Sequence, residues 1–148
     1  MFLSNLRKDM YLIDKSDKSI ELKILGYQFP EIDYDDDSEW LNILINVKTR
    51  NIQYEIREPC IRTREIVRMI KGLENLLRGV IGQYETDFME PDLDIKFESA
   101  QIEFRQFFCT AFDEREEVRI TSKISKSDLE SIIMQLKDEY AEILKGQN

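Results

Sequence analysis

Apolar and polar residues alternate along several stretches of this chain, and that alternation restricts the possible folds more than any other feature. Residues 20–24 show the period of a strand with one buried face. Residues 41–47 and 52–56 repeat it on either side of a short turn and predict a hairpin, which we expect to end at Glu58 and Pro59. Further strands are predicted over residues 10–13, 93–97, 102–112 and 118–124. From Phe107 to Phe112 both faces are apolar, which predicts a central strand covered on both sides.

Two other stretches have apolar residues spaced three and four apart, the pattern of a helix with one apolar stripe. The first begins at Thr63, its expected N-cap, and stops at Gly79. The second begins at a predicted capping box, Ser127 with Glu130, and stops at Gly146. Short connections and one-sided strands predict an α+β fold, with an antiparallel β-sheet of about six to eight strands and two helices packed on its apolar face.

The length of 148 residues predicts one domain over residues 1–148. No apolar run reaches the ~18 residues that a membrane span needs. The apolar start of the chain is too short for a signal peptide and is followed at once by charged residues. We therefore expect a cytoplasmic protein with no membrane partner.

The net charge of −9 argues against direct binding of nucleic acid, because phosphates would be repelled. An acidic surface suits a basic protein partner, although acidity also serves solubility alone. The absence of histidine excludes that residue as a base or metal ligand, and no known cofactor motif occurs. Cys60 and Cys109 are isolated, so we expect reduced core cysteines, no metal and no cofactor.

Six of the nine residues from 31 to 39 are acidic, and none is basic. Asp33, Asp35 and Asp37 resemble the start of a calcium-binding EF-hand loop, but Ser38 and Leu44 stand where that loop needs glycine and glutamate. Crowded carboxylates repel one another, and a basic partner would relieve that repulsion. The alternative is an ordinary solvated loop. The candidate partner-binding residues are Asp33, Tyr34, Asp35, Asp36, Asp37 and Glu39.

Arg62, Arg64, Arg68 and Lys71 crowd the first half of the first predicted helix, where cations oppose the helix dipole. They are either ordinary surface residues or partners for the acidic run or for acids of another protein. Trp40, directly after that run, is either a core anchor or a binding hot spot.

A second acidic cluster is predicted to lie between two strands. Paired carboxylates serve as acid and base in some hydrolases, but nothing in the sequence selects two members of this cluster. The cluster consists of Asp113, Glu114, Glu116 and Glu117.

Several short motifs together resemble the WapI-type immunity proteins of bacterial contact-dependent toxin systems. They are Gly26-Tyr27-Gln28-Phe29-Pro30, an acidic spacer, Trp40-Leu41, Glu58-Pro59-Cys60 leading to Thr63 and Glu65, and Glu90-Pro91 with Leu93 and Phe97. The resemblance implies a cytosolic protein that binds and neutralises the toxic C-terminal domain of a secreted polymorphic toxin, often an RNA-cleaving nuclease. It identifies no toxin-binding residues.

Two other hypotheses stay open from the sequence. One is an acidic binding or regulatory module for a different basic protein. The other is an enzyme that uses surface carboxylates, which would need a pocket holding a carboxylate of raised pKa.

Overall fold

The computed structural model describes residues 10–27, 39–109 and 114–145, which form eight strands and two helices. The first half of the chain contains four strands and a helix: β1 (Met10–Asp14), β2 (Lys18–Tyr27), β3 (Trp40–Thr49), β4 (Gln53–Arg62) and α1 (Thr63–Leu77). The second half repeats this order: β5 (Gln83–Glu85), β6 (Leu93–Glu98), β7 (Gln101–Cys109), β8 (Arg115–Lys123) and α2 (Lys126–Lys145). Every predicted element is present, and only the three-residue β5, too short for a period-2 signal, was not predicted.

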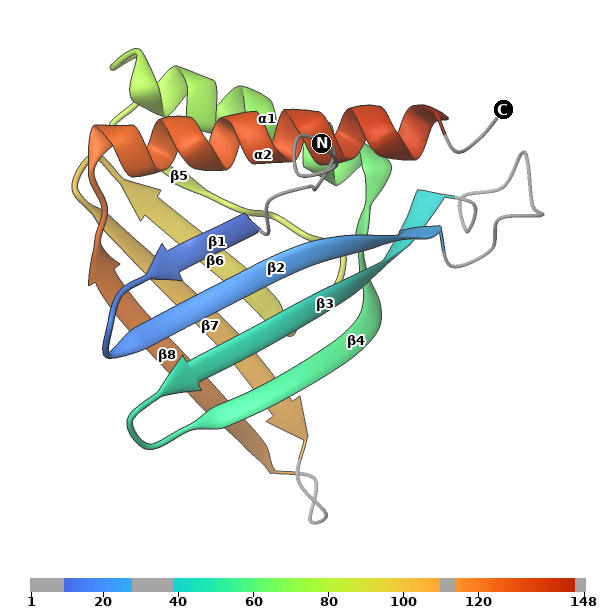
Figure 1. Ribbon diagram of the computed structural model, residues 1–148, viewed down its shortest axis with the longest axis vertical. Coiled ribbons are helices and arrows are strands. Elements are labelled where there is room, and N and C mark those ends of the chain that lie inside the picture. The colour runs from blue at the N-terminus through green and yellow to red at the C-terminus, as the bar shows by residue number, and fades with distance from the viewer. Residues whose placement is uncertain (1–9, 28–38, 110–113, 146–148) are drawn as a thin grey trace, which may run out of the picture.

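The predicted α+β class and antiparallel pairing are confirmed, but the strands form two sheets rather than one. Each sheet has four strands in sequence order, β1-β2-β3-β4 and β5-β6-β7-β8. All neighbouring strands are antiparallel. The division falls at α1, because the helix carries the chain away from β4 before β5 begins a new sheet (Figure 1).

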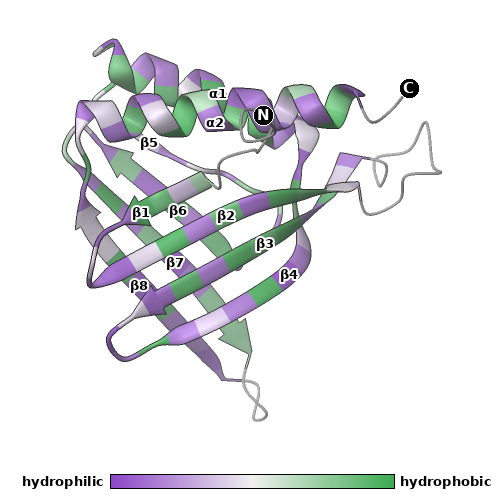
Figure 2. Ribbon diagram, in the orientation of Figure 1, coloured by the Kyte–Doolittle hydropathy of each residue, from purple (hydrophilic) through white to green (hydrophobic). Residues whose placement is uncertain are grey.

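The two sheets lie face to face with their strands crossing, and their apolar faces share one core (Figure 1). Figure 2 shows the alternation of apolar and polar residues along the strands that makes this possible. Ile43 and Ile45 of β3 and Phe97 and Phe104 of the second sheet are fully buried. Polar contacts also join the sheets, since the Tyr54 hydroxyl of β4 donates to Gln106 Oε1 of β7 at 2.5 Å.

Both helices lie side by side across one end of the paired sheets, with their apolar stripes turned toward the core (Figure 1). Leu73 of α1 and Leu136 of α2 are almost completely buried. Glu139 of α2 is only 1% exposed. Its Oε2 accepts a hydrogen bond from the backbone N–H of Ile24 at 3.3 Å, where the pairing of β2 with β3 shifts register. The helices therefore cover the apolar side that the two sheets share.

The prediction that Pro59 ends its strand is wrong, because β4 continues to Arg62. β4 is an edge strand of its sheet, where proline is tolerated because one side of the backbone makes no hydrogen bonds to another strand. Leu41 pairs with Ile61 and Asn42 with Pro59, which leaves Cys60 as the extra residue of a bulge.

Both predicted helix starts are displaced. The N-cap of α1 is Arg62 rather than Thr63, and Glu65, three residues later, accepts a hydrogen bond from Arg62 N at 2.9 Å. The cap of α2 is formed by Ser125 and Asp128, not by Ser127 and Glu130: Ser125 N donates to Asp128 Oδ2 at 2.8 Å, and Asp128 N donates to Ser125 Oγ at 3.0 Å.

The Asp128 carboxylate interacts through hydrogen bonds with the backbone and side chain of Ser125. These bonds stabilise its ionised form and so hold its pKa below the usual value.

The predicted stop of the first helix is confirmed, since Gly79 has a φ of 77° and its N–H bonds to Leu76 O at 3.1 Å. Gly146, the other predicted stop, lies outside the described residues.

The core prediction holds for Cys60 and is wrong for Cys109. Cys60 is buried, which raises the pKa of its thiol to about 12, whereas Cys109 is exposed at the end of β7. Phe107 and Phe108 are only half-buried, so the prediction that this end of the strand is covered on both sides is also wrong. β7 reaches past the shared core at this end. Residues 110–112 of the predicted apolar run lie outside the described part of the chain.

Gly72 lies in the interior of α1, and the ring of Tyr84 from β5 packs directly against it. A Cβ built on Gly72 would overlap with Cδ1 and Cε1 of that ring and lie 2.8 Å from its Cζ. The same ring stacks on Phe97, with 6.5 Å between the centroids. The glycine therefore allows β5 to approach the helix closely.

We predict that Gly72→Ala lowers the free energy of unfolding by ~1–3 kcal/mol, the usual cost of overpacking. Alanine gains ~1 kcal/mol in helix propensity over glycine, so a net loss would show that the clash with Tyr84 dominates. Urea unfolding provides the measurement. Gly82→Ala is the matched control, because a Cβ at Gly82 meets nothing within 4 Å. Equal stability of Gly72→Ala and the parent would contradict this packing.

Candidate interaction surface

Of the six predicted partner-binding residues, the structure describes Glu39. Asp33, Tyr34, Asp35, Asp36 and Asp37 lie outside the described residues. Glu39 directly precedes β3, whose first residue, Trp40, pairs with Arg62 at the end of β4. The pairing of these two strands therefore brings the last residue of the acidic run to the start of α1.

Three hydrogen bonds join Glu39 to the first two residues of α1. Thr63 Oγ1 donates to Glu39 Oε1 at 3.2 Å, and Arg64 Nε donates to the same oxygen at 3.1 Å. Arg64 Nη2 donates to Glu39 Oε2, which makes the pair bidentate. The bond from Arg64 is the main cause that lowers the pKa of Glu39. Arg64, one of the arginines whose role the sequence left open, thus pairs with the acidic run.

Arg62 is 8% exposed, which is unusual for an arginine. Its guanidinium carbon lies 5.8 Å from the centroid of the Trp40 ring, within reach of a cation–π contact. Its Nε lies 3.2 Å from Glu65 Oε1 as an ion pair, although the geometry is not that of a hydrogen bond. Trp40 is half-buried beneath this arginine rather than being a core residue.

Glu65 is the central carboxylate of this region and is only 2% exposed. Besides capping α1, it accepts a hydrogen bond from the backbone N–H of Met89 at 2.7 Å and so joins the helix to the segment before β6. From the sequence, Glu65 was identified only as part of the motif that follows Glu58-Pro59-Cys60. A glutamate three residues after an N-cap often accepts the N-cap N–H, so its position was a signal from which this capping role could have been predicted.

A cavity of about 430 Å³ opens beside Glu65, between α1, β5 and the segment that follows β5. Its side chains are two aromatic rings, three carboxylates and one guanidinium. They belong to Tyr84, Phe88, Glu65, Glu85, Asp87 and Arg68. Burial raises the pKa of Tyr84 to about 12, so its phenol stays neutral at physiological pH.

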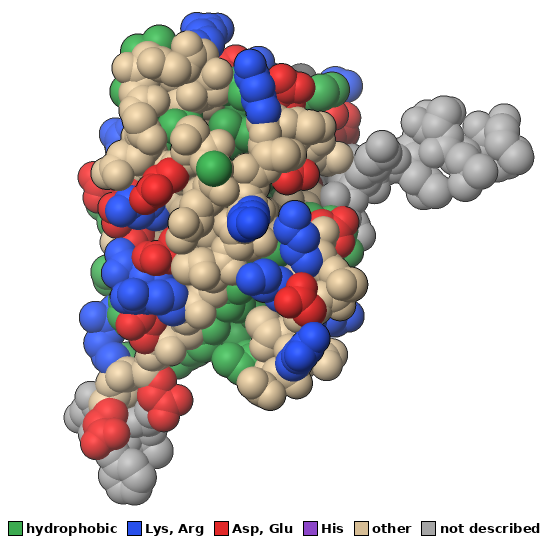
Figure 3. All heavy atoms as spheres, turned by 90° about the vertical axis from the view of Figure 1, so that its left-hand side faces the viewer, with side chains coloured by type: hydrophobic (Ala, Val, Ile, Leu, Met, Phe, Trp, Pro, Cys, Tyr) green, Lys and Arg blue, Asp and Glu red, His purple; other side chains and the backbone are tan. Residues whose placement is uncertain are grey.

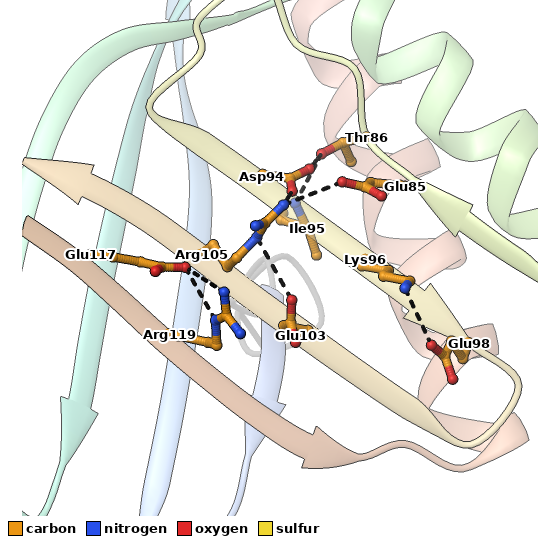
Figure 4. Close-up of polar contacts among 10 residues, drawn as sticks. All are labelled: Glu85, Thr86, Asp94, Ile95, Lys96, Glu98, Glu103, Arg105, Glu117 and Arg119. Atoms are coloured by element: carbon orange, nitrogen blue, oxygen red, sulfur yellow. Dashed lines mark hydrogen bonds and ion pairs between the residues drawn. The ribbon is translucent and has the colours of Figure 1, made fainter.

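The outer face of the second sheet carries a network of ion pairs centred on Arg105 of β7 (Figure 4). Arg105 Nη2 bonds to Asp94 of β6 and lies 3.4 Å from Glu85 Oε2 of β5, while its Nε lies 3.6 Å from Glu103 Oε1. The carboxylates of Asp94 and Glu85 both lie beside Arg105 Nη2, and the proximity of Asp94 raises the pKa of the Glu85 carboxyl. Three carboxylates therefore share one arginine.

The second acidic cluster does not form a carboxylate pair among the described residues. Glu116 and Glu117 belong to β8 rather than to a connection, and successive residues of a strand point to opposite faces. Glu117 Oε1 pairs with Arg119 at 3.0 Å (Figure 4). Glu114 is exposed, and Asp113 lies outside the described residues.

The charge of the described surface is uneven. Lys15, Lys18, Lys48 and Arg50 gather around a cavity of about 360 Å³ between the β1–β2 and β3–β4 turns, with Asp17 as the one acidic lining residue. Figure 3 shows basic and acidic side chains interspersed on that side of the molecule.

Neither described helix combines the length and the apolarity needed to cross a membrane. Among the residues that the structure describes, no three cysteine or carboxylate side chains are grouped as metal ligands.

Comparison with known proteins found one matching family model. Residues 11–143 match the model described as the immunity protein WapI-like family, which covers nearly the whole chain. No curated protein and no solved structure matches the chain.

We predict that Arg64→Gln raises the pKa of Glu39, because its main charge-stabilising bond is lost. Carboxylate NMR of the full chain between pH 7 and 3 would measure this shift. A depressed carboxyl pKa stabilises the fold above its unfolded value, and this stability is lost as pH falls through the folded value. Arg64→Gln should therefore cost ~0.2–1 kcal/mol at pH 7 and less in acid. Arg119→Gln is a matched control, and a Glu39 pKa that is the same in both variants would refute the pairing.

Proposed function

Because the chain belongs to the immunity protein WapI-like family, we propose that it binds and neutralises the toxic C-terminal domain of a secreted polymorphic toxin. The family match over residues 11–143 is the observation that carries this proposal. It extends across both sheets and both helices, so it concerns the whole described fold rather than one motif.

We further propose that the toxin is a basic, RNA-cleaving nuclease and that inhibition works by occupying its substrate-binding surface. Nucleases need positive charge to hold phosphates. An acidic protein with a net charge of −9 is attracted to such a surface and can exclude the substrate from it. The same charge repels nucleic acid, so the partner is the toxin and not its substrate.

The docking surface that we propose is the acidic run with its described end at Glu39. Asp33, Asp35, Asp36 and Asp37 supply charge, and Tyr34 supplies an aromatic contact within the run. Glu39 is fixed to α1 by Thr63 and Arg64, so the C-terminal end of the run is anchored to a rigid element.

The mechanism that we propose is stoichiometric inhibition rather than catalysis. The sequence has no histidine and no recognisable activated nucleophile, and residues 1–148 would act as a single cytoplasmic domain. The proposal needs only a stable complex between one protein and one toxin domain.

A second candidate function is an acidic binding module for a different basic protein, which the net charge of −9 also favours. The two proposals differ in the identity of the partner. Co-expression with the toxin domain encoded directly upstream would rescue growth only if the first is correct.

We predict that titration of the toxin domain with this protein gives complete inhibition near a ratio of one to one. Residual nuclease activity on a labelled RNA would be measured at toxin concentrations far above the dissociation constant. Complete inactivation at a small fraction of one equivalent would instead indicate an enzyme that modifies the toxin.

We predict that replacing Asp35, Asp36 and Asp37 with asparagine slows association with the toxin and weakens its dependence on salt. Electrostatic steering raises association rates by ~10–10³-fold and is screened by ions. Stopped-flow measurements at two salt concentrations test this. Replacing Glu114, Glu116 and Glu117 with glutamine is the matched control, since it removes the same charge from the second acidic cluster. If the triple asparagine variant associates as fast as the parent at low salt, the acidic run is not the docking surface.

A further inference from the structure

The cavity beside Glu65 has the features of a binding pocket that the proposed mechanism does not use. Its volume of about 430 Å³ lies within the ~300–1,000 Å³ typical of ligand pockets. Two aromatic rings, those of Tyr84 and Phe88, supply apolar walls that pack against the core. The Tyr84 ring is held in place by its stacking on Phe97 and by its close fit against Gly72.

The charge of the lining selects the class of ligand. Three carboxylates line the cavity and one guanidinium, that of Arg68, accompanies them. In the described part of the chain no ion pair joins Arg68 to a carboxylate, and its single positive charge leaves carboxylates in excess in the lining. An anionic ligand would meet net repulsion here, and a cation would be attracted.

The three carboxylates differ in how far hydrogen bonds and ion pairs within the protein already compensate their charge. Glu65 is buried, forms an ion pair with Arg62 and accepts hydrogen bonds from the backbone N–H groups of Arg62 and Met89, so its charge is already balanced and it forms the fixed base of the pocket. Glu85 shares Arg105 with Asp94 and Glu103, and Figure 4 shows it at the edge of that network. Asp87 is exposed and has no ion pair among the described residues, which leaves its full charge available.

The close contact between Glu85 and Asp94 also favours a cation. Both carboxylates lie beside Arg105 Nη2, and the proximity of Asp94 raises the pKa of Glu85, as expected where negative charges are crowded. An incoming cation beside Glu85 would relieve that crowding and return the pKa toward its usual value.

We propose that this pocket receives an arginine side chain from a basic protein partner. A guanidinium is planar, stacks on aromatic rings and donates two parallel hydrogen bonds to a carboxylate. The pocket offers both surfaces together, with the rings of Tyr84 and Phe88 beside Asp87 and Glu85. The proposal rests on the proposed function only for the identity of the partner as the toxin, because the pocket chemistry is independent of it.

The test is an NMR titration of the full chain with N-acetyl-arginine amide as the probe. We expect saturable shifts of the backbone amides of Arg68 and of residues 84–89. The neutral isostere N-acetyl-citrulline amide should bind at least fivefold more weakly, and so should N-acetyl-lysine amide, which cannot stack or bind in a bidentate manner.

Two variants assign the shifts to the pocket. Asp87→Asn changes an exposed side chain and should weaken the probe at least fivefold without altering the fold. Glu130→Gln removes one charge from the exposed side of α2, outside the pocket lining, and should leave binding unchanged. Linear, non-saturating shifts, equal binding of the citrulline or lysine analogue, or an unchanged affinity of Asp87→Asn would each overturn the proposal.

The outcome of this test is independent of the test of the proposed function, because the probe titration contains no toxin. If the chain binds the arginine probe saturably but neutralises no toxin, the pocket proposal is supported and the proposed function is refuted. If the chain neutralises the toxin but does not bind the probe, the proposed function is supported and the pocket proposal is refuted.

Discussion

The burial of two apolar sheet faces against each other is the interaction on which the rest of this structure depends. Neither four-stranded sheet can hide its inner face alone, and the alternating Ile, Leu, Val and Phe side chains of both meet in one core. The crossing of the strands leaves the core open at one end, and the stripes of α1 and α2 cover it there. Hydrophobic burial thus fixes where the helices lie.

The position of α1 in turn decides where the charged groups gather. Its first turn receives Glu39 from the start of β3, and its Glu65 reaches the segment before β6. Cations near a helix N-terminus are unfavourable, and here Glu39 and Glu65 offset Arg64 and Arg62. Glu39 at the start of β3, the segment before β6 and the aromatic pocket therefore all lie against the first half of α1.

Membership of an immunity protein family gives this arrangement a biological meaning. A surface that is ordered before binding avoids the loss of affinity that ordering it on binding would cause. Glu65 and Glu139 are almost fully buried and each accepts a backbone N–H from a distant element, which fixes the helices to the sheets. In the function and the pocket that we propose, negative charge would speed association and the pocket would slow dissociation.

The sequence by itself determined every element except the short β5, because the alternation over residues 41–47 and the stripe around Leu73 depend only on neighbours along the chain. It also determined the family, through short motifs such as Glu58-Pro59-Cys60. Only the tertiary structure decided the division into two sheets, the exposure of Cys109 and the pocket beside Glu65. Those features arise from contacts between residues far apart in the chain, such as Glu65 with Met89 and Gly72 with Tyr84, which no local period records.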